Sequence, residues 1–147
     1  MISPRIIAAS ALLALAACQS GPEGPAGTTR ESPGEAFSAI GPKETIKFVG
    51  TEPFWGGEAA TGSLTYSTPE NQDGTTIAVE RFAGNNGLGF SGTLDGQTFD
   101  MTVTPGECSD GMSDRAYPFT VTLKIGPEQR NGCAWTERTP FSGPKHP

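Results

Sequence analysis

Apolar and polar side chains alternate strictly over residues 119–125, and this pattern constrains the fold more than any other. Successive side chains of a strand point to opposite faces, so the pattern predicts a β-strand with one buried face and one solvated face. The apolar positions are Phe119, Val121, Leu123 and Ile125. No segment of useful length repeats its apolar residues at helical spacing.

Further short strands are expected along the chain, joined by glycine-rich turns. Asp95-Gly96 is the strongest hairpin signal, and a second turn is expected over 69–74, where Asp73-Gly74 favours a hairpin. We therefore expect an all-β fold of about seven to eight strands with one disulfide, either a small antiparallel meander barrel or a sandwich. The barrel is preferred because consecutive hairpins close easily and hide their edges. The remaining strands are expected at 45–50, 63–67, 75–82, 88–94, 97–103 and 129–136.

The N-terminus has the features of a secretion signal. Arg5 precedes an apolar run over 6–17, which is shorter than the roughly 20 residues that span a bilayer. The small residues before Cys18 resemble a bacterial lipobox, which implies cleavage before Cys18 and acylation of this cysteine. Gln19 after it implies the outer membrane, and several acyl chains would anchor the protein stably. An ordinary secretory signal beside a chance cysteine is the alternative.

The composition divides the chain into four parts. Residues 1–17 are the expected lipoprotein signal peptide, and 18–42 are the acylated cysteine with a flexible Gly/Pro-rich tether. A β domain is predicted over 43–138 and a disordered tail over 139–147. The protein is thus expected in the bacterial cell envelope, bound to the membrane through its lipid and facing the periplasm.

The charge of the chain limits the classes of partner, and its cysteine content predicts a disulfide. The net charge is −6 and no basic cluster is present, which argues against nucleic-acid binding. A cationic partner is favoured electrostatically, although solubility explains the same imbalance. With Cys18 acylated, Cys108 and Cys133 remain, and an even pair in an oxidising compartment predicts a disulfide. Closing that loop would stabilise the fold by about 3.5 kcal/mol.

The residues present fit few catalytic mechanisms. The single histidine, His146, lies in the expected tail, so a Ser-His-Asp arrangement lacks its base and histidine-based zinc ligation fails. Asp110 to Asp114 do not have calcium-loop spacing. Carboxylate-dependent hydrolysis is the remaining enzymatic alternative, but a small core leaves little room for a substrate cleft. We expect no enzyme, no metal and no cofactor.

Residues 107–118 concentrate acids, serines, an arginine and a tyrosine between two expected strands. In one interpretation the loop is architectural: its carboxylates cap turns, Arg115 bridges Asp110, Asp114 or Glu52, and Tyr117 and Met112 plug the barrel end. In the other it presents a binding surface together with the aromatic turn at 50–57. Trp55 is expected as a core plug more than as an exposed anchor. The predicted binding residues are Glu52, Trp55, Asp110, Ser113, Asp114, Arg115 and Tyr117.

Three motifs go beyond composition: Gly-Thr-Glu-Pro-Phe-Trp at 50–55, Cys-Ser-Asp-Gly-Met-Ser-Asp-Arg-Ala-Tyr-Pro at 108–118, and Gly-Cys-Ala at 132–134. Together they resemble an uncharacterised family of bacterial envelope lipoproteins, which implies envelope location but no assigned reaction. A looser similarity extends to the membrane-bound inhibitors of c-type lysozyme. It implies that Ser113, Arg115 and Tyr117 would face a lysozyme-like partner, although the short Ser-Gly-Ala-like loop of those inhibitors is missing.

Overall fold

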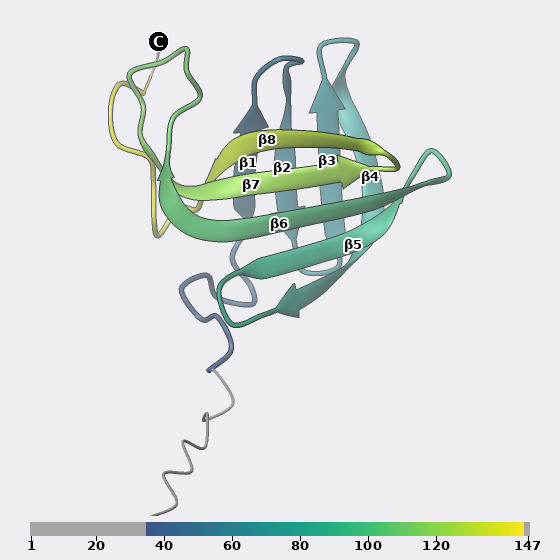
Figure 1. Cartoon of the computed structure of the whole chain (residues 1–147), viewed down its shortest axis with the longest axis horizontal. Helices are drawn as coiled ribbons and strands as arrows, with labels where there is room; N and C mark the ends of the chain where they lie inside the picture. Colours follow the sequence, from purple (N-terminus) through teal and green to yellow (C-terminus); the bar gives the residue numbers. More distant parts are fainter. Residues whose placement is uncertain (1–34, 146–147) are drawn as a thin grey trace, which may run out of the picture. The chain divides into compact units, whose positions relative to one another are not determined.

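The computed structural model describes residues 35–145 and contains eight β-strands (Figure 1). The predicted signal peptide, Cys18, the tether up to residue 34 and His146 lie outside the described residues. Within 35–145 no helix is long and apolar enough to cross a membrane. The strands are β1 (Ile46–Gly50), β2 (Trp55–Ala60), β3 (Ser63–Thr68), β4 (Asn71–Ala83), β5 (Leu88–Leu94), β6 (Gln97–Cys108), β7 (Tyr117–Ile125) and β8 (Glu128–Trp135).

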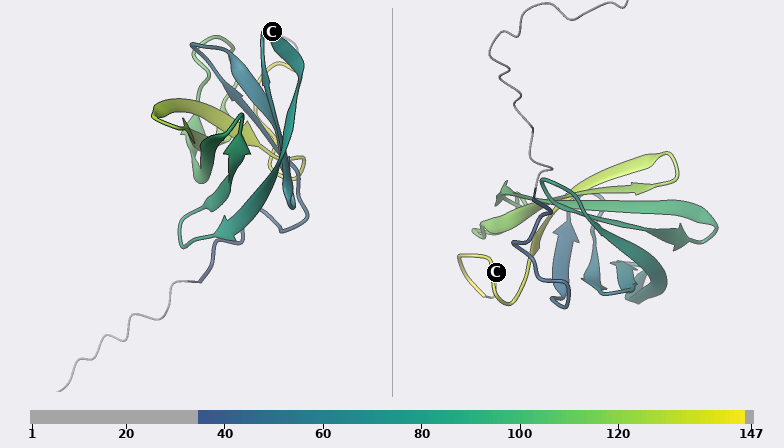
Figure 2. Two further views of the ribbon diagram at one scale, coloured as in Figure 1. Left: turned by 90° about the vertical axis from the view of Figure 1, so that its right-hand side faces the viewer. Right: turned by 90° about the horizontal axis from the view of Figure 1, so that it is seen from below.

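The strands form a closed antiparallel barrel in sequence order, which confirms the predicted meander barrel. Closure comes from β1 and β8, which pair from Lys47–Trp135 to Gly50–Gly132. In Figure 1, β1 to β3 stand upright while β6 to β8 run across them, and Figure 2 shows this crossing from two further sides. Closure leaves no long unpaired edge in the barrel.

The core follows the alternation of the strands. In β7, Phe119, Val121 and Leu123 are buried, and the threonines between them are partly or fully exposed. The buried side chains of all eight strands meet in one apolar cluster. The strand predicted from residues 119–125 is therefore confirmed, with Tyr117 and Pro118 added at its start.

Two turns test the hairpin predictions. Asp95 and Gly96 connect β5 to β6 with φ of 49° and 78°, so the hairpin predicted there is confirmed. The turn predicted over 69–74 is present at Pro69 and Glu70, between β3 and β4, but its placement at Asp73-Gly74 is wrong because the two strands already pair at Thr68–Asn71. Gly74, with φ of 78°, instead lies in β4 where the register with β3 shifts. Positive φ at glycine serves a bulge as readily as a turn.

The folded part extends beyond the predicted limits of 43 and 138. Ile40, assigned to the tether, is 1% exposed within the core, and the amide of Phe37 donates to the carbonyl of Gly84 at 2.7 Å. On the C-terminal side, Ser142 pairs with Ala116, so 139–145 is not a disordered tail. Single apolar residues within Gly/Pro-rich sequence gave no periodic pattern to indicate this burial.

Candidate functional site: a cleft between the first turn and the stapled loop

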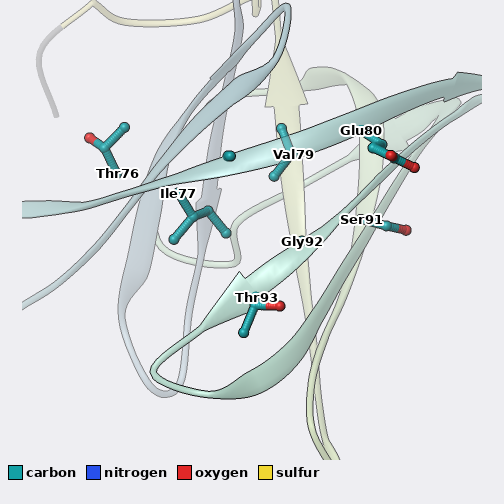
Figure 3. A pocket seen from close by; sticks show the side chains of 8 residues that line it. Thr76, Ile77, Val79, Glu80, Ser91, Gly92 and Thr93 are labelled. Carbon is teal, nitrogen blue, oxygen red and sulfur yellow. The ribbon is translucent and has the colours of Figure 1, made fainter.

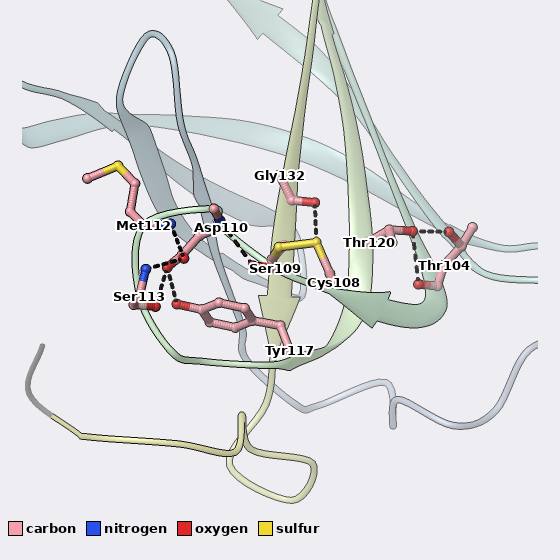
Figure 4. The surroundings of a disulfide bond; sticks show 11 residues. Thr104, Cys108, Ser109, Asp110, Met112, Ser113, Tyr117, Thr120 and Gly132 are labelled. Carbon is pink, nitrogen blue, oxygen red and sulfur yellow. Dashed lines mark hydrogen bonds between the residues drawn. A yellow bond between two sulfur atoms is a disulfide. The ribbon is translucent and has the colours of Figure 1, made fainter.

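The predicted disulfide between Cys108 and Cys133 is present, with an S–S distance of 2.01 Å and a Cα–Cα distance of 5.6 Å (Figure 4). Cys108 ends β6 and Cys133 lies in β8, two strands that both pair with β7. The Cys108 sulfur also lies 3.3 Å from the carbonyl oxygen of Gly132, a contact without a proton to share. The disulfide thus fixes the point at which the loop over residues 109–116 leaves the barrel.

Asp110 organises this loop from within (Figure 4). Its Oδ1 accepts from the amides of Met112 at 3.0 Å and Ser113 at 2.8 Å. Its Oδ2 accepts from the hydroxyls of Ser113 at 2.7 Å and Tyr117 at 3.0 Å. These bonds use the lone pairs of the carboxylate, so Asp110 is a turn-capping residue.

The same bonds decide the charge of Asp110. Partial burial by itself raises its pKa, but the hydrogen bonds, led by the Ser113 amide, outweigh burial and lower the pKa to about 2. The carboxylate is therefore ionised at neutral pH. A group held in this state accepts hydrogen bonds well and donates protons poorly.

Arg115 does not bridge Asp110, Asp114 or Glu52, so the predicted ion pairs are wrong. Its Nε donates to the carbonyl of Pro144 at 2.8 Å, and its Nη2 donates to that of Lys145 at 2.5 Å. The guanidinium lies 4.6 Å above the ring of Phe141. Arg115 is held by the C-terminal segment (residues 139–145), which the sequence pattern had placed in a disordered tail.

Tyr117 closes the loop against a small aromatic cluster. Its ring lies 5.4 Å from that of Trp135 and 5.5 Å from that of Phe141. Tyr117 is 2% exposed, which agrees with the predicted plug, but Met112 is 66% exposed and plugs nothing. Half of that prediction is wrong because the Asp110 hydrogen bonds turn the loop backbone and leave Met112 outside.

Trp55 is a core residue, as expected, and is only 4% exposed. Its ring packs between those of Phe48 and Tyr66, at 5.8 and 6.2 Å. It lies so close to Gly50 that a Cβ there would come within 2.0 Å of the indole Nε1. This N–H is buried and has no hydrogen-bond partner among the described residues.

Two of the three sequence motifs, those at 50–55 and 108–118, meet at one cleft of about 280 Å³ between the β1–β2 turn and the 109–116 loop. Trp55, Asp110, Ser113, Arg115 and Tyr117 of the predicted binding set line it. Glu52 and Asp114 are exposed and adjoin lining residues in the chain, without lining the cleft themselves. The other lining residues are Val49, Gly50, Thr51, Phe54 and Met112.

Phe54 and Met112 were missed as binding residues. Phe54 is 50% exposed despite its place in an aromatic turn, and Met112 lies in the loop that Asp110 folds. Their occurrence as large apolar residues among turn-forming neighbours was the available signal. Only the tertiary structure brings the two side chains to the same cleft.

A larger hollow of about 770 Å³ lies between β4 and β5 (Figure 3). It forms where β4 leaves its pairing with β3 and begins to pair with β5. Its lining mixes small polar residues and glycine with Ile77, Ala78 and Val79, and Glu80 is its one ionisable residue. Volume alone does not make a site, and this hollow brings no buried polar group or aromatic anchor together.

Among residues 35–145, no group of three His, Cys, Asp or Glu side chains comes together as metal ligands would. No protein-family model, curated protein or solved structure matches the chain. The resemblance to envelope lipoproteins therefore stays a prediction from the sequence motifs.

Proposed function

We propose that this protein is a non-enzymatic binding module of the bacterial envelope, anchored through Cys18 at the outer membrane and facing the periplasm. The cleft carries the proposal. Two segments that are distant in the sequence form its walls. One of them, the 109–116 loop, is held in place by the disulfide and by the hydrogen bonds that the Asp110 carboxylate accepts. A preorganised cleft with exposed apolar residues at its mouth suits recognition, because little conformational entropy is lost on binding.

The chemistry of the cleft favours binding over hydrolysis. A carboxylate pair that hydrolyses glycosides needs a general acid with a raised pKa. Asp110 has its pKa lowered to about 2 and its oxygens occupied by four hydrogen bonds. A carboxylate in this state is suited to holding the loop in shape.

Inhibition of c-type lysozyme is the alternative binding function, and the geometry supports it less. Tyr117 is buried and the Ser113 hydroxyl is bonded to Asp110, so neither projects for insertion into an enzyme cleft. Titration of lysozyme with the full chain tests this alternative. Lysozyme that stays fully active at micromolar protein would end it.

Site-specific photocrosslinking in cells tests the binding cleft. Benzoylphenylalanine replaces Phe54 in one strain and Phe82, which is 70% exposed on β4, in a matched control strain. We expect a defined crosslinked adduct from position 54 and none from position 82. Absence of an adduct at position 54 under all growth conditions would contradict the proposal.

The anchor is tested separately. We expect Cys18→Ser to abolish lipid labelling of the protein and release it from the membrane fraction, since the acyl chains supply the membrane affinity. A variant that stays membrane-bound without lipid would contradict the anchoring.

A further inference from the structure

Large apolar side chains gather at the mouth of the cleft. Within the described part of the chain, the exposed large apolar residues are Phe54, Phe82 and Met112, and two of the three line this cleft. Methionine adapts its shape to different partners, and an aromatic ring adds contact area. Exposed apolar residues brought together from separate segments mark an interaction surface.

The size of the cleft limits what enters it. Its volume of about 280 Å³ lies below the usual range of roughly 300–1,000 Å³ for pockets that enclose a drug-sized ligand. One inserted side chain fits this space better than a whole ligand. The floor includes Trp55, whose indole ring packs against Gly50 and gives the inserted side chain an aromatic surface to contact.

The charges around the cleft are unbalanced. Glu52 and Asp114 are exposed on either side of it, and neither makes a side-chain hydrogen bond or ion pair within residues 35–145. Asp110 adds a third negative charge. Arg115 is the single base in these two segments, and its donors point to the carbonyls of the C-terminal segment. The rim therefore carries net negative charge in a chain that is acidic overall, at −6.

We propose that the occupant of this cleft is a polypeptide segment that presents one large apolar side chain flanked by basic residues. The inference rests on the proposed binding function. The apolar side chain enters between Phe54 and Met112, and the flanking bases face Glu52 and Asp114. Such charge pairing at a rim governs partner choice and association rate more than affinity.

Selection from a library of random heptapeptides displayed on phage, against the immobilised full chain, tests the proposal. We expect enrichment of peptides with an aromatic or large aliphatic residue next to Lys or Arg. Phe54→Ala/Met112→Ala should weaken binding of the selected peptides at least about tenfold, while Phe82→Ala leaves it unchanged. Circular dichroism of each variant confirms that it is folded.

Two charge-matched double variants separate the effect of the rim carboxylates on peptide selection from the effect of the net charge of the protein. Glu52→Gln/Asp114→Asn and Glu80→Gln/Asp95→Asn remove the same two charges, and each pair includes one residue with positive φ. We expect the first pair to lose the enrichment of basic residues and the second to keep it. Enriched peptides with acidic or uncharged flanks would overturn this inference while leaving the cleft as a binding site. If the selected peptides bind the Phe54→Ala/Met112→Ala variant as tightly as the wild type, both this inference and the cleft as a binding site would be overturned.

Discussion

The N-terminal segment (residues 35–45) and the 109–116 loop both fold onto the barrel, but they orient their large apolar side chains in opposite ways. The N-terminal segment sends Ile40 into the core, while Glu44 is partly buried and Lys43 is exposed. The loop turns the carboxylate of Asp110 inward to its own amides and leaves Met112 exposed. The first arrangement contributes to folding free energy by burying apolar area, whereas the second keeps apolar area available for contact.

The fastening of the two segments differs as well. Arg81 donates to the carbonyl of Ile40 at 3.0 Å, and Glu44 accepts from the Gly41 amide at 2.6 Å and pairs with Arg138 at 2.7 Å. The Gly41 amide is the main cause that lowers the pKa of Glu44. The loop instead relies on the covalent bond of Cys108 and on Asp110. A segment with little buried apolar area needs such fixed links to stay ordered.

The largest expected effect is loss of the disulfide. Cys108→Ser/Cys133→Ser should lower the free energy of unfolding by about 3.5 kcal/mol, because the unfolded chain regains the entropy of an open loop. Urea denaturation of the full chain measures this. Dithiothreitol should have the same effect on the wild type and none on the variant. A decrease in the free energy of unfolding below about 1 kcal/mol would mean that the loop is ordered without the disulfide.

Ile40→Ala comes next and probes the N-terminal segment. A buried isoleucine cut to alanine leaves a cavity, so the free energy of unfolding should fall by about 3 kcal/mol. Phe82→Ala, at a residue that is 70% exposed, is the control and should change it by less than about 0.5 kcal/mol. Similar losses in both variants would show that Ile40 adds nothing specific to the core.

Asp110→Asn should have a smaller effect that depends on pH. The pKa of Asp110 is lowered from 3.8 to about 2, so its contribution is present above pH 4 and is lost as pH falls towards 2. We expect a loss of about 1–2 kcal/mol at pH 7, discounted for solvent screening, that vanishes near pH 2. Urea unfolding across this range measures the difference, with Asp95→Asn as the charge-matched control. A difference that is constant with pH would contradict the role given to the carboxylate.

The smallest effect is expected for Arg138→Gln. Its side chain is 60% exposed, so the pair with Glu44 should contribute less than about 0.5 kcal/mol, and less still at high salt. Thermal unfolding at low and high salt measures it. A loss above about 1.5 kcal/mol would contradict the small contribution expected of this exposed pair.

Local patterns in the sequence were enough for the all-β meander and the disulfide, whereas closure into a barrel depends on the pairing of β1 with β8. The strict alternation in β7 and the Asp95-Gly96 turn can each be predicted from a few neighbouring residues, because strand period and turn conformation are local properties. β2 was not predicted as a strand, since Gly56, Gly57, Ala59 and Ala60 provide little alternation. Its pairing with β1 and β3 is decided by register across the sheet.

The candidate site likewise combines features that the sequence predicted with features that only the tertiary structure decided. The sequence by itself placed the candidate binding residues in two motifs and favoured a core position for Trp55. Only the tertiary structure decided that Arg115 turns to the C-terminal segment, that Met112 faces outward, and that Phe54 joins it across the cleft. These outcomes depend on contacts between segments far apart in the chain, where several partners of equal chemistry compete and geometry selects one.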